Sequence, residues 1–263
     1  MMNREQMVVS IPHAGTLIPD DIRALIPHDE LTVRNESDLF SDRIFTIDGA
    51  RIVTTPYSRM ISDPNRAPDE IYSEGMLRSL GVVMFDLHDG RPVFSKDPSL
   101  HTVSEWTHRF HVPYHNALAK VVKGAKFLID GHTMWSKGVP GHFGGAGKER
   151  ADIVLGNQYF CTCSAETTNF FASFFREKNY NVAINDPYPG RFILGTYCSR
   201  LYVPGIQIEI NRKLFLDEKT LEPDEESIQK LHAEFDELVT RFCSWFKGPM
   251  KPEEKAPVDL SRR

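Results

Sequence analysis

A short apolar segment that runs into Asp-Gly-His constrains this fold more than any other stretch of the sequence. Residues 127–129 (Phe-Leu-Ile) have the length and character of a buried strand, and Gly131 is expected to end it. Asp130 and His132 would then lie at the carboxyl end of the strand, where open α/β sheets place their ligand crevices. A histidine with a carboxylate two residues away can bind a metal ion or move a proton. The alternative, from this motif alone, is a loop histidine bonded to the backbone.

Length and composition indicate one soluble domain. The chain has 263 residues, of which 41% are hydrophobic and 25% charged, enough to bury a sizeable core. We expect a single α/β domain over residues 1–248 and a flexible tail over 249–263, which is rich in Pro, Lys and Glu. The net charge of −5 argues against a nucleic-acid partner. No apolar run approaches the ~18 residues that span a bilayer, so no membrane segment is expected.

The first residues and the cysteines favour a reducing compartment. Residues 1–6 (Met-Met-Asn-Arg-Glu-Gln) lack the apolar core of a signal peptide. Cys161 and Cys163 do not have the CxxC spacing of a zinc knuckle, and no second pair follows, so free thiols are expected. We therefore predict a cytoplasmic protein.

A second histidine follows another predicted strand. Residues 6–11 favour a strand, and His13 comes directly after it, as His132 follows its own strand. Because neighbouring strand ends converge on one crevice, the two imidazoles are expected to meet. Glu36 and Asp38 precede an amphipathic run, where this segment either caps a helix or supplies a carboxylate to a metal site. Two histidines, one carboxylate and a water would complete a catalytic zinc site.

Arginines in three loops suggest an anionic ligand. Residues 57–66 carry Arg59, Asn65 and Arg66, and the planar fork of arginine binds carboxylates through paired hydrogen bonds. A surface loop with an Arg–Asp pair is the alternative. The glycine-rich loop 138–150, with Arg150, and the turn-rich loop 185–192, with Arg191, could meet the same anion.

Periodicity predicts the remaining elements. In residues 205–212, Ile206, Ile208 and Ile210 alternate with polar residues, so Glu209 projects from the polar face of a strand. That carboxylate is either a general base facing the proposed metal or part of a solvated edge strand. His115 belongs to a predicted helix and could line the site. The other predicted elements are strands at 51–55, 151–157 and 180–184, a strand-and-turn region at 81–96 with a hairpin tip at 87–90, and helices at 104–122 (kinked or restarted at Pro113), from 164, and at 224–246.

The order of these motifs resembles the N-formylglutamate amidohydrolase family. The similarity covers about residues 8–215, and its elements are residues 12–15 (Pro-His-Ala-Gly), 36–38 (Glu-Ser-Asp), 59–66, 113–115 (Pro-Tyr-His), 130–132 (Asp-Gly-His), 152–156 (Asp-Ile-Val-Leu-Gly) and 207–209 (Gln-Ile-Glu). The resemblance implies a zinc-carboxypeptidase-like (phosphorylase/hydrolase-like) α/β fold. In such a fold one domain holds a mixed, mostly parallel β-sheet flanked by helices.

The resemblance also implies a reaction and its residues. The family hydrolyses N-formyl-L-glutamate to formate and L-glutamate in histidine breakdown, with a zinc ion or another divalent metal. By position in the motifs, the metal ligands are His13, His132 and Asp38, with Glu36 as the alternative carboxylate, the base is Glu209, and Arg66, next to Asn65, binds a substrate carboxylate. Beyond the motif matches, we expect Arg59 to stabilise the oxyanion and Asn65, Arg191, Arg150 and His115 to contact the substrate.

Two loops, residues 141–147 and 188–191, depart from the family pattern, which leaves the acyl amino acid open. A related zinc amidase acting on another N-acyl amino acid or a peptidoglycan fragment is one rival. A binding protein that kept the fold without catalysis is another. The expected partner is a small molecule, and the oligomeric state is left open.

Overall fold

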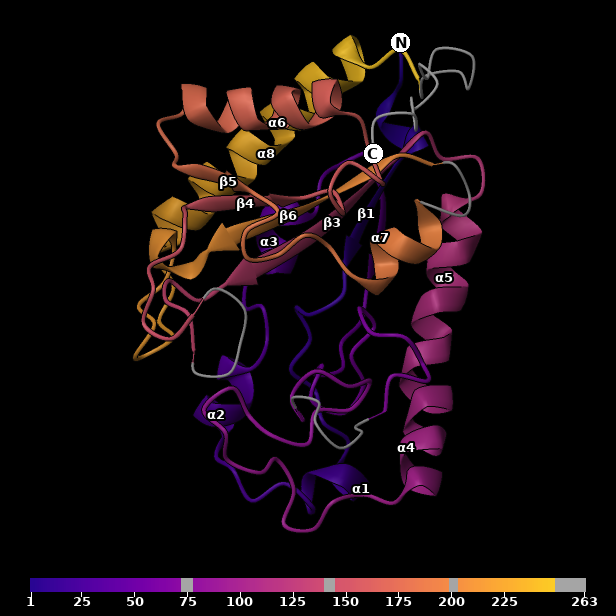
Figure 1. Ribbon diagram of the computed structural model, residues 1–263, viewed down its shortest axis with the longest axis vertical. Coiled ribbons are helices and arrows are strands. Elements are labelled where there is room, and N and C mark those ends of the chain that lie inside the picture. The colour runs from indigo at the N-terminus through magenta and orange to yellow at the C-terminus, as the bar shows by residue number, and fades with distance from the viewer. Residues whose placement is uncertain (72–77, 140–144, 199–202, 249–263) are drawn as a thin grey trace, which may run out of the picture.

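One mixed β-sheet organises the protein. A computed structural model describes residues 1–71, 78–139, 145–198 and 203–248. The strands in it are β1 (Met7–Ile11), β2 (Arg51–Thr54), β3 (Phe127–Met134), β4 (Ile153–Gly156), β5 (Val182–Ile184) and β6 (Gly205–Asn211). They lie in the order β2-β1-β3-β6-β4-β5, and every neighbouring pair is parallel except β4 and β6 (Figure 1). The predicted α/β class with a mixed, mostly parallel sheet is confirmed.

Helices cover both faces of this sheet and extend below it. They are α1 (Asp20–Arg23), α2 (Glu30–Asn35), α3 (Ser41–Phe45), α4 (Leu100–Trp106), α5 (Val112–Val122), α6 (Ala165–Glu177), α7 (Phe192–Tyr197) and α8 (Glu225–Trp245), with short 3₁₀ turns at Arg4–Gln6 and Arg212–Leu214. In Figure 1, α6 and α8 lie over one face, α5 and α7 lie against the other, and α1, α2 and α4 surround irregular segments beneath. Within the described residues, no helix is both long and apolar enough to cross a bilayer.

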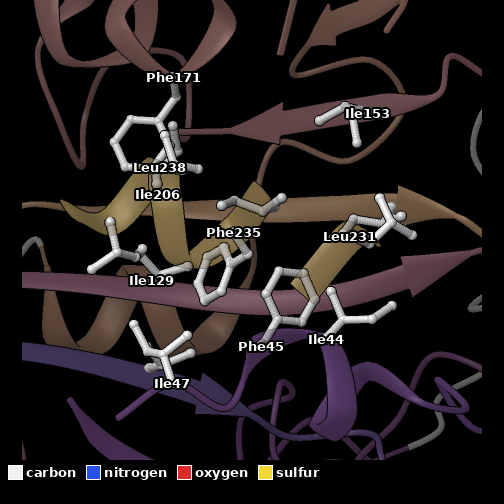
Figure 2. Packing of buried hydrophobic residues seen from close by; sticks show 14 of the residues in the cluster. Ile44, Phe45, Ile47, Ile129, Ile153, Phe171, Ile206, Leu231, Phe235 and Leu238 are labelled. Atoms are coloured by element: carbon white, nitrogen blue, oxygen red, sulfur yellow. The ribbon is translucent and has the colours of Figure 1, made fainter. Parts of the chain in front are cut away.

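Alternation along the strands divides the sheet into two chemically different faces. Met7, Val9 and Ile11 of β1 point into the main core together with Ile129 of β3. Figure 2 shows that core, where Phe45 of α3 meets Phe235 of α8 edge to face with ring centroids 5.0 Å apart. On the opposite face, Val8 and Leu128 near the start of β1 and β3 pack on α5 and α7, and Ser10, Asp130 and His132 follow further along these two strands. The candidate site lies on the polar half of this face of the sheet.

Gly131 does not end its strand, contrary to the expectation from the sequence. β3 continues through it to Met134, paired with β6 along its length. A Cβ on Gly131 would lie 2.7 Å from the ring of Phe45, so glycine is required here by packing. As a result Asp130 and His132 lie within β3, two residues apart on the same face.

Two other local expectations need correction. Residues 81–96 form no regular strands, although the predicted hairpin tip at 87–90 is confirmed: the Gly90 N–H donates to the Leu87 carbonyl, and a single antiparallel bridge joins Asp86 to Pro92. This segment instead packs irregularly in a separate apolar cluster with α1 and α4. The predicted helix begins at Leu100, capped by Ser99, and passes through a π-helical turn before α5. That wider turn precedes Pro113, which lacks an N–H to donate. The predicted tail, 249–263, lies outside the described residues.

Candidate active site

Three side chains from separate parts of the chain meet at the carboxyl ends of β1 and β3. His13 follows β1, Asp38 lies between α2 and α3, and His132 is in β3. His132 Nδ1 lies 3.2 Å from His13 Nδ1 and 3.1 Å from Asp38 Oδ2, and His13 Nδ1 lies 3.4 Å from the same oxygen. All three residues are buried. The expectation that the two imidazoles meet is confirmed.

A buried carboxylate faces the far nitrogen of each ring. His13 Nε2 lies 2.7 Å from Asp63 Oδ1, and His132 Nε2 lies 3.0 Å from Asp130 Oδ2. Because an ionised carboxylate only accepts hydrogen bonds, both Nε2 atoms are N–H donors. This leaves both Nδ1 atoms directed at Asp38, in the arrangement that proteins use to orient metal-binding histidines.

The triangle of His13, Asp38 and His132 requires positive charge at its centre. Two ring lone pairs at this spacing, next to a carboxylate, repel unless a proton or a cation lies among them. Burial opposes a charge on His132, but Asp130 and Asp38 raise its pKa well above the usual value. Burial likewise acts to raise the pKa of Asp38, yet the two histidines bring it well below its usual range. Two imidazole nitrogens and one carboxylate oxygen, all within 4.8 Å of one another, form a donor set that zinc accepts.

Asp38, and not Glu36, is the carboxylate of this triangle. The Asp38 backbone N–H donates to the His13 carbonyl at 2.8 Å, and the Thr133 N–H donates to Asp38 Oδ2 at 3.2 Å. Glu36 lines the same cavity but pairs with His88 Nδ1. Asp38 does not cap a helix with its side chain, since α3 begins after Phe40 without a side-chain cap.

Glu209 lies beside His132 on the polar face of β6. The two residues are opposite each other in the parallel pair β3–β6, so their side chains project from the same face. Burial raises the pKa of Glu209 to about 7, with His132 lowering it and Asp38 raising it. Gln207 Nε2 donates to its carboxylate at 3.0 Å. The solvated edge-strand alternative is wrong, because β6 lies inside the sheet and Glu209 is only 7% exposed.

Arginines line the cavity around this centre. Arg59 Nη2 lies 2.6 Å from Asp63 Oδ2, and its Nη1 lies 4.0 Å from Asp38. Arg66 is also buried, and no carboxylate of the described residues forms a salt bridge with it. Burial, Arg59 and Arg191 lower the pKa of Arg66. Two neighbouring guanidinium groups, one of them without a salt-bridge partner, suit an anionic ligand.

Three residues that were predicted to bind substrate form hydrogen bonds with other parts of the protein. His115 is not among the cavity-lining residues; its Nε2 lies 2.9 Å from the Pro64 carbonyl and its Nδ1 2.9 Å from the Tyr197 hydroxyl. Arg150 is buried and is not among the cavity-lining residues; it donates to the Trp135 carbonyl, and its guanidinium lies over the ring of Tyr188, which does line the cavity. Asn65 lines the cavity, yet its amide donates to Asp130 and accepts from the Ile193 N–H. These contacts make Asn65 a support for the histidines.

Buried polar atoms without a partner gather around this cavity. They include Nε of Arg59, Arg66 and Arg212, together with Thr133 Oγ1 and Gln207 Oε1, all from cavity-lining residues. Native proteins leave few buried polar groups unbonded. A cluster of them at one cavity indicates a place where a polar ligand, an ion or ordered water completes the bonding.

A family model for N-formylglutamate amidohydrolases matches residues 5–216. The chain belongs to the N-formylglutamate amidohydrolase family. An N-formylglutamate deformylase of Pseudomonas putida is 23% identical over 230 residues, which cover 82% of this chain and 83% of that protein. The matched range contains every site residue that was predicted from the sequence.

Two solved structures share the fold of this family member. The N-formylglutamate amidohydrolase of Ralstonia eutropha superposes with a TM-score of 0.80 at 24% identity, covering 91% of this chain and 93% of that one. A gene product of Agrobacterium tumefaciens superposes with a TM-score of 0.68 at 16% identity, covering 90% and 91%. At these identities the likeness speaks for the fold alone.

The sequence reasoning missed several residues of the site. Arg212 donates to the carbonyls of Asn35 and Ser37 and lies 3.6 Å from Asp38 Oδ1, so it holds the loop that carries Asp38. The sequence placed Asp63 only within the polar loop 57–66 and His88 only at the predicted hairpin tip 87–90. No spacing rule connects these residues to the histidines, and no helical or strand periodicity marks them as site residues.

Proposed function

We propose that this protein is a zinc-dependent amidohydrolase that cleaves N-formyl-L-glutamate to formate and L-glutamate. The observation that carries the proposal is the buried triangle of His13, Asp38 and His132 with Glu209 beside it, in a member of this family. Those three ligands would hold the zinc ion. When bound, such a cation supplies Lewis-acid chemistry, lowering the pKa of a water to about 7 and polarising a carbonyl.

Glu209 is the proposed general base. It takes a proton from the attacking water and later gives it to the nitrogen of the leaving glutamate. A pKa of about 7 suits both steps, because the carboxylate can accept and release a proton near neutral pH. The bond from Gln207 restrains the carboxylate in the cavity.

Arginines supply the remaining roles. Arg59, held by Asp63, is placed to stabilise negative charge that develops on the formyl oxygen. Arg66 and Arg191 are the proposed anchors for a substrate carboxylate, because Arg66 lines the cavity with no acid paired to it among the described residues. An anchored carboxylate would orient the amide towards Glu209.

A substrate screen tests this function. Purified protein is assayed for amine release from N-formyl and N-acetyl amino acids, before and after chelation and again after zinc is returned. We expect the highest kcat/KM for N-formyl-L-glutamate, loss of activity with the chelator and recovery with zinc. A preference for another acyl amino acid would assign a related amidase. No hydrolysis and no zinc uptake would favour a non-catalytic binding protein.

Two variant comparisons test the residue roles. Glu209→Gln is expected to lower kcat by about 10²–10⁴-fold while the protein keeps its zinc. Glu234→Gln, which alters a carboxylate on α8 bonded to Tyr180, is the matched control. A fully active Glu209→Gln protein would remove Glu209 from the mechanism. For the anchors, Arg66→Met should reduce kcat/KM for N-formyl-L-glutamate more than for N-formyl-L-glutamine if Arg66 binds the side-chain carboxylate.

A further inference from the structure

A chain of hydrogen bonds runs from helix α5 to the back of His132. The Tyr114 hydroxyl lies 2.8 Å from Ser10 Oγ, which donates to Asp130 Oδ1 at 2.7 Å. The other oxygen of Asp130 faces His132 Nε2 at 3.0 Å. All four residues are buried, with exposures between 0% and 4%. None of these contacts reaches the cavity side of His132.

The fold brings the four residues together from three elements. Ser10 and Asp130 are opposite each other in the parallel pair β1–β3, so their side chains lie side by side on one face. His132 is two residues further along β3 on that same face. Tyr114 reaches them from α5, packed in the apolar cluster that contains Val8. The arrangement is thus built on two neighbouring strands inside the sheet, β1 and β3, and on the helix packed against them.

The direction of each hydrogen bond follows from simple chemistry. The Asp130 carboxylate can only accept, so Ser10 must use its single hydroxyl proton to donate to it. Ser10 can then only accept from Tyr114, which becomes the donor at the start of the chain. Burial raises the pKa of Tyr114 well above its usual value, so the phenol keeps that proton at working pH.

These hydrogen bonds fix the orientation of the His132 ring through Asp130. Asp130 accepts from Ser10 at one oxygen, and from His132 and Asn65 at the other. A carboxylate held in this way keeps Nε2 of His132 as the N–H donor and turns the Nδ1 lone pair towards His13 and Asp38. Partners of this kind, one layer behind a metal ligand, change metal affinity by about 10–100-fold.

We propose that Ser10 and Tyr114 are positioning residues that raise the affinity of the His13–Asp38–His132 site for a divalent cation by orienting Asp130 and, through it, His132. The inference rests on the proposed function only in requiring that the site binds a cation. It assigns a role to two residues that touch neither cation nor substrate.

Zinc affinity, measured by competition with a chromophoric chelator, tests the proposal on the full-length protein. We expect about fivefold weaker binding for Tyr114→Phe, the factor contributed by one neutral hydrogen bond. About tenfold weaker binding is expected for Ser10→Ala, which leaves Asp130 without a donor at one oxygen. Tyr180→Phe, which removes a phenol bonded to Glu234 on α8, should leave the affinity unchanged. Tyr114→Phe keeps the ring in its apolar cluster, so folding is expected to persist.

A spectroscopic readout separates orientation from general destabilisation. In the zinc-loaded protein, the Nε2–H proton resonance of His132 should move upfield in both variants, because its bond to Asp130 weakens. The Nε2–H resonance of His13, bonded to Asp63, should not move. The inference would be overturned if the wild-type protein bound zinc, both variants had zinc affinities within twofold of the wild type, and the His132 resonance did not move. The proposed function would still stand in that case. A wild-type protein that takes up no cation would overturn both.

Discussion

The two histidines of the site are both bonded to a buried aspartate, but the two aspartates have different partners. Each ring gives its Nε2–H to a buried aspartate. Asp63, behind His13, lies in a loop and is paired with Arg59, and although burial acts to raise its pKa, Arg59 and His13 hold that pKa well below its usual range. Asp130, behind His132, lies in a central strand and is bonded by hydroxyl and amide groups.

This difference shows two ways of surrounding a buried carboxylate with partners. The His13 half relies on an opposite charge, which costs desolvation of both partners and fails badly if one is removed. In the His132 half, the other donors to Asp130 are neutral groups of modest value, the Ser10 hydroxyl on β1 and the Asn65 side-chain amide. Asn65 joins the halves: its backbone N–H donates to Asp63 at 2.8 Å and its side chain donates to Asp130 at 3.3 Å.

Removing the charge from the His13 half should have the largest effect on stability. Asp63→Asn leaves the Arg59 guanidinium buried without its closest partner, so the free energy of unfolding is expected to fall by about 3–5 kcal/mol. Urea unfolding with chelator present measures it. Asp236→Asn, which breaks the more exposed pair with Arg4, should cost less than about 1 kcal/mol. Equal losses in both variants would contradict the comparison.

The same change in the His132 half should affect cation binding more than folding. Asp130→Asn keeps an acceptor of similar shape but weakens the hold on His132, so zinc affinity is expected to fall about 10–100-fold. The free energy of unfolding of the metal-free protein should fall by less than in Asp63→Asn. Chelator competition and urea unfolding on the same samples provide both numbers. A larger stability loss in Asp130→Asn than in Asp63→Asn would reverse the assignment.

Proton release should distinguish the halves more finely. Because the pKa of His132 is raised, chiefly by Asp130 working against burial, its ring carries an extra proton in the metal-free protein near neutral pH. A protonated ring cannot bind a cation, so zinc affinity is expected to fall about tenfold per pH unit as the pH drops below that pKa. In Asp130→Asn the same decline should begin at a lower pH. A pH-independent affinity in the wild type would refute this.

The smallest effect is expected from the carboxylate that belongs to neither half. Glu36 pairs with His88, so Glu36→Gln should leave zinc affinity within about twofold of wild type. Asp38→Asn, its matched partner two residues away, should lose far more. If Glu36→Gln weakened zinc as much as Asp38→Asn, the choice between the two acids would have to be reopened.

Part of the candidate site could be predicted from the sequence. His13 and His132 each follow an apolar run, and such runs forecast buried strands whose ends converge. Glu209 was visible because Ile206, Ile208 and Ile210 place it on the other face. Residue patterns did not choose between Glu36 and Asp38, which only the family resemblance favoured, because both follow the same helix and the loop geometry turns one of them to the histidines. The contacts of His115 with the Pro64 carbonyl and the Tyr197 hydroxyl were not visible either, because a helical position does not say which groups its ring meets.

The sequence by itself determined the α/β class, the alternation that makes one face polar, and two of the three triangle residues, because strand periodicity is a local property of neighbouring side chains. Only the tertiary structure decided that Asp63 and Asp130 orient the two rings, that Arg212 holds the Asp38 loop, and that Ser10 and Tyr114 lie behind His132. Those contacts join residues as far apart as 177 positions. They depend on strand register and loop packing, which local patterns do not encode.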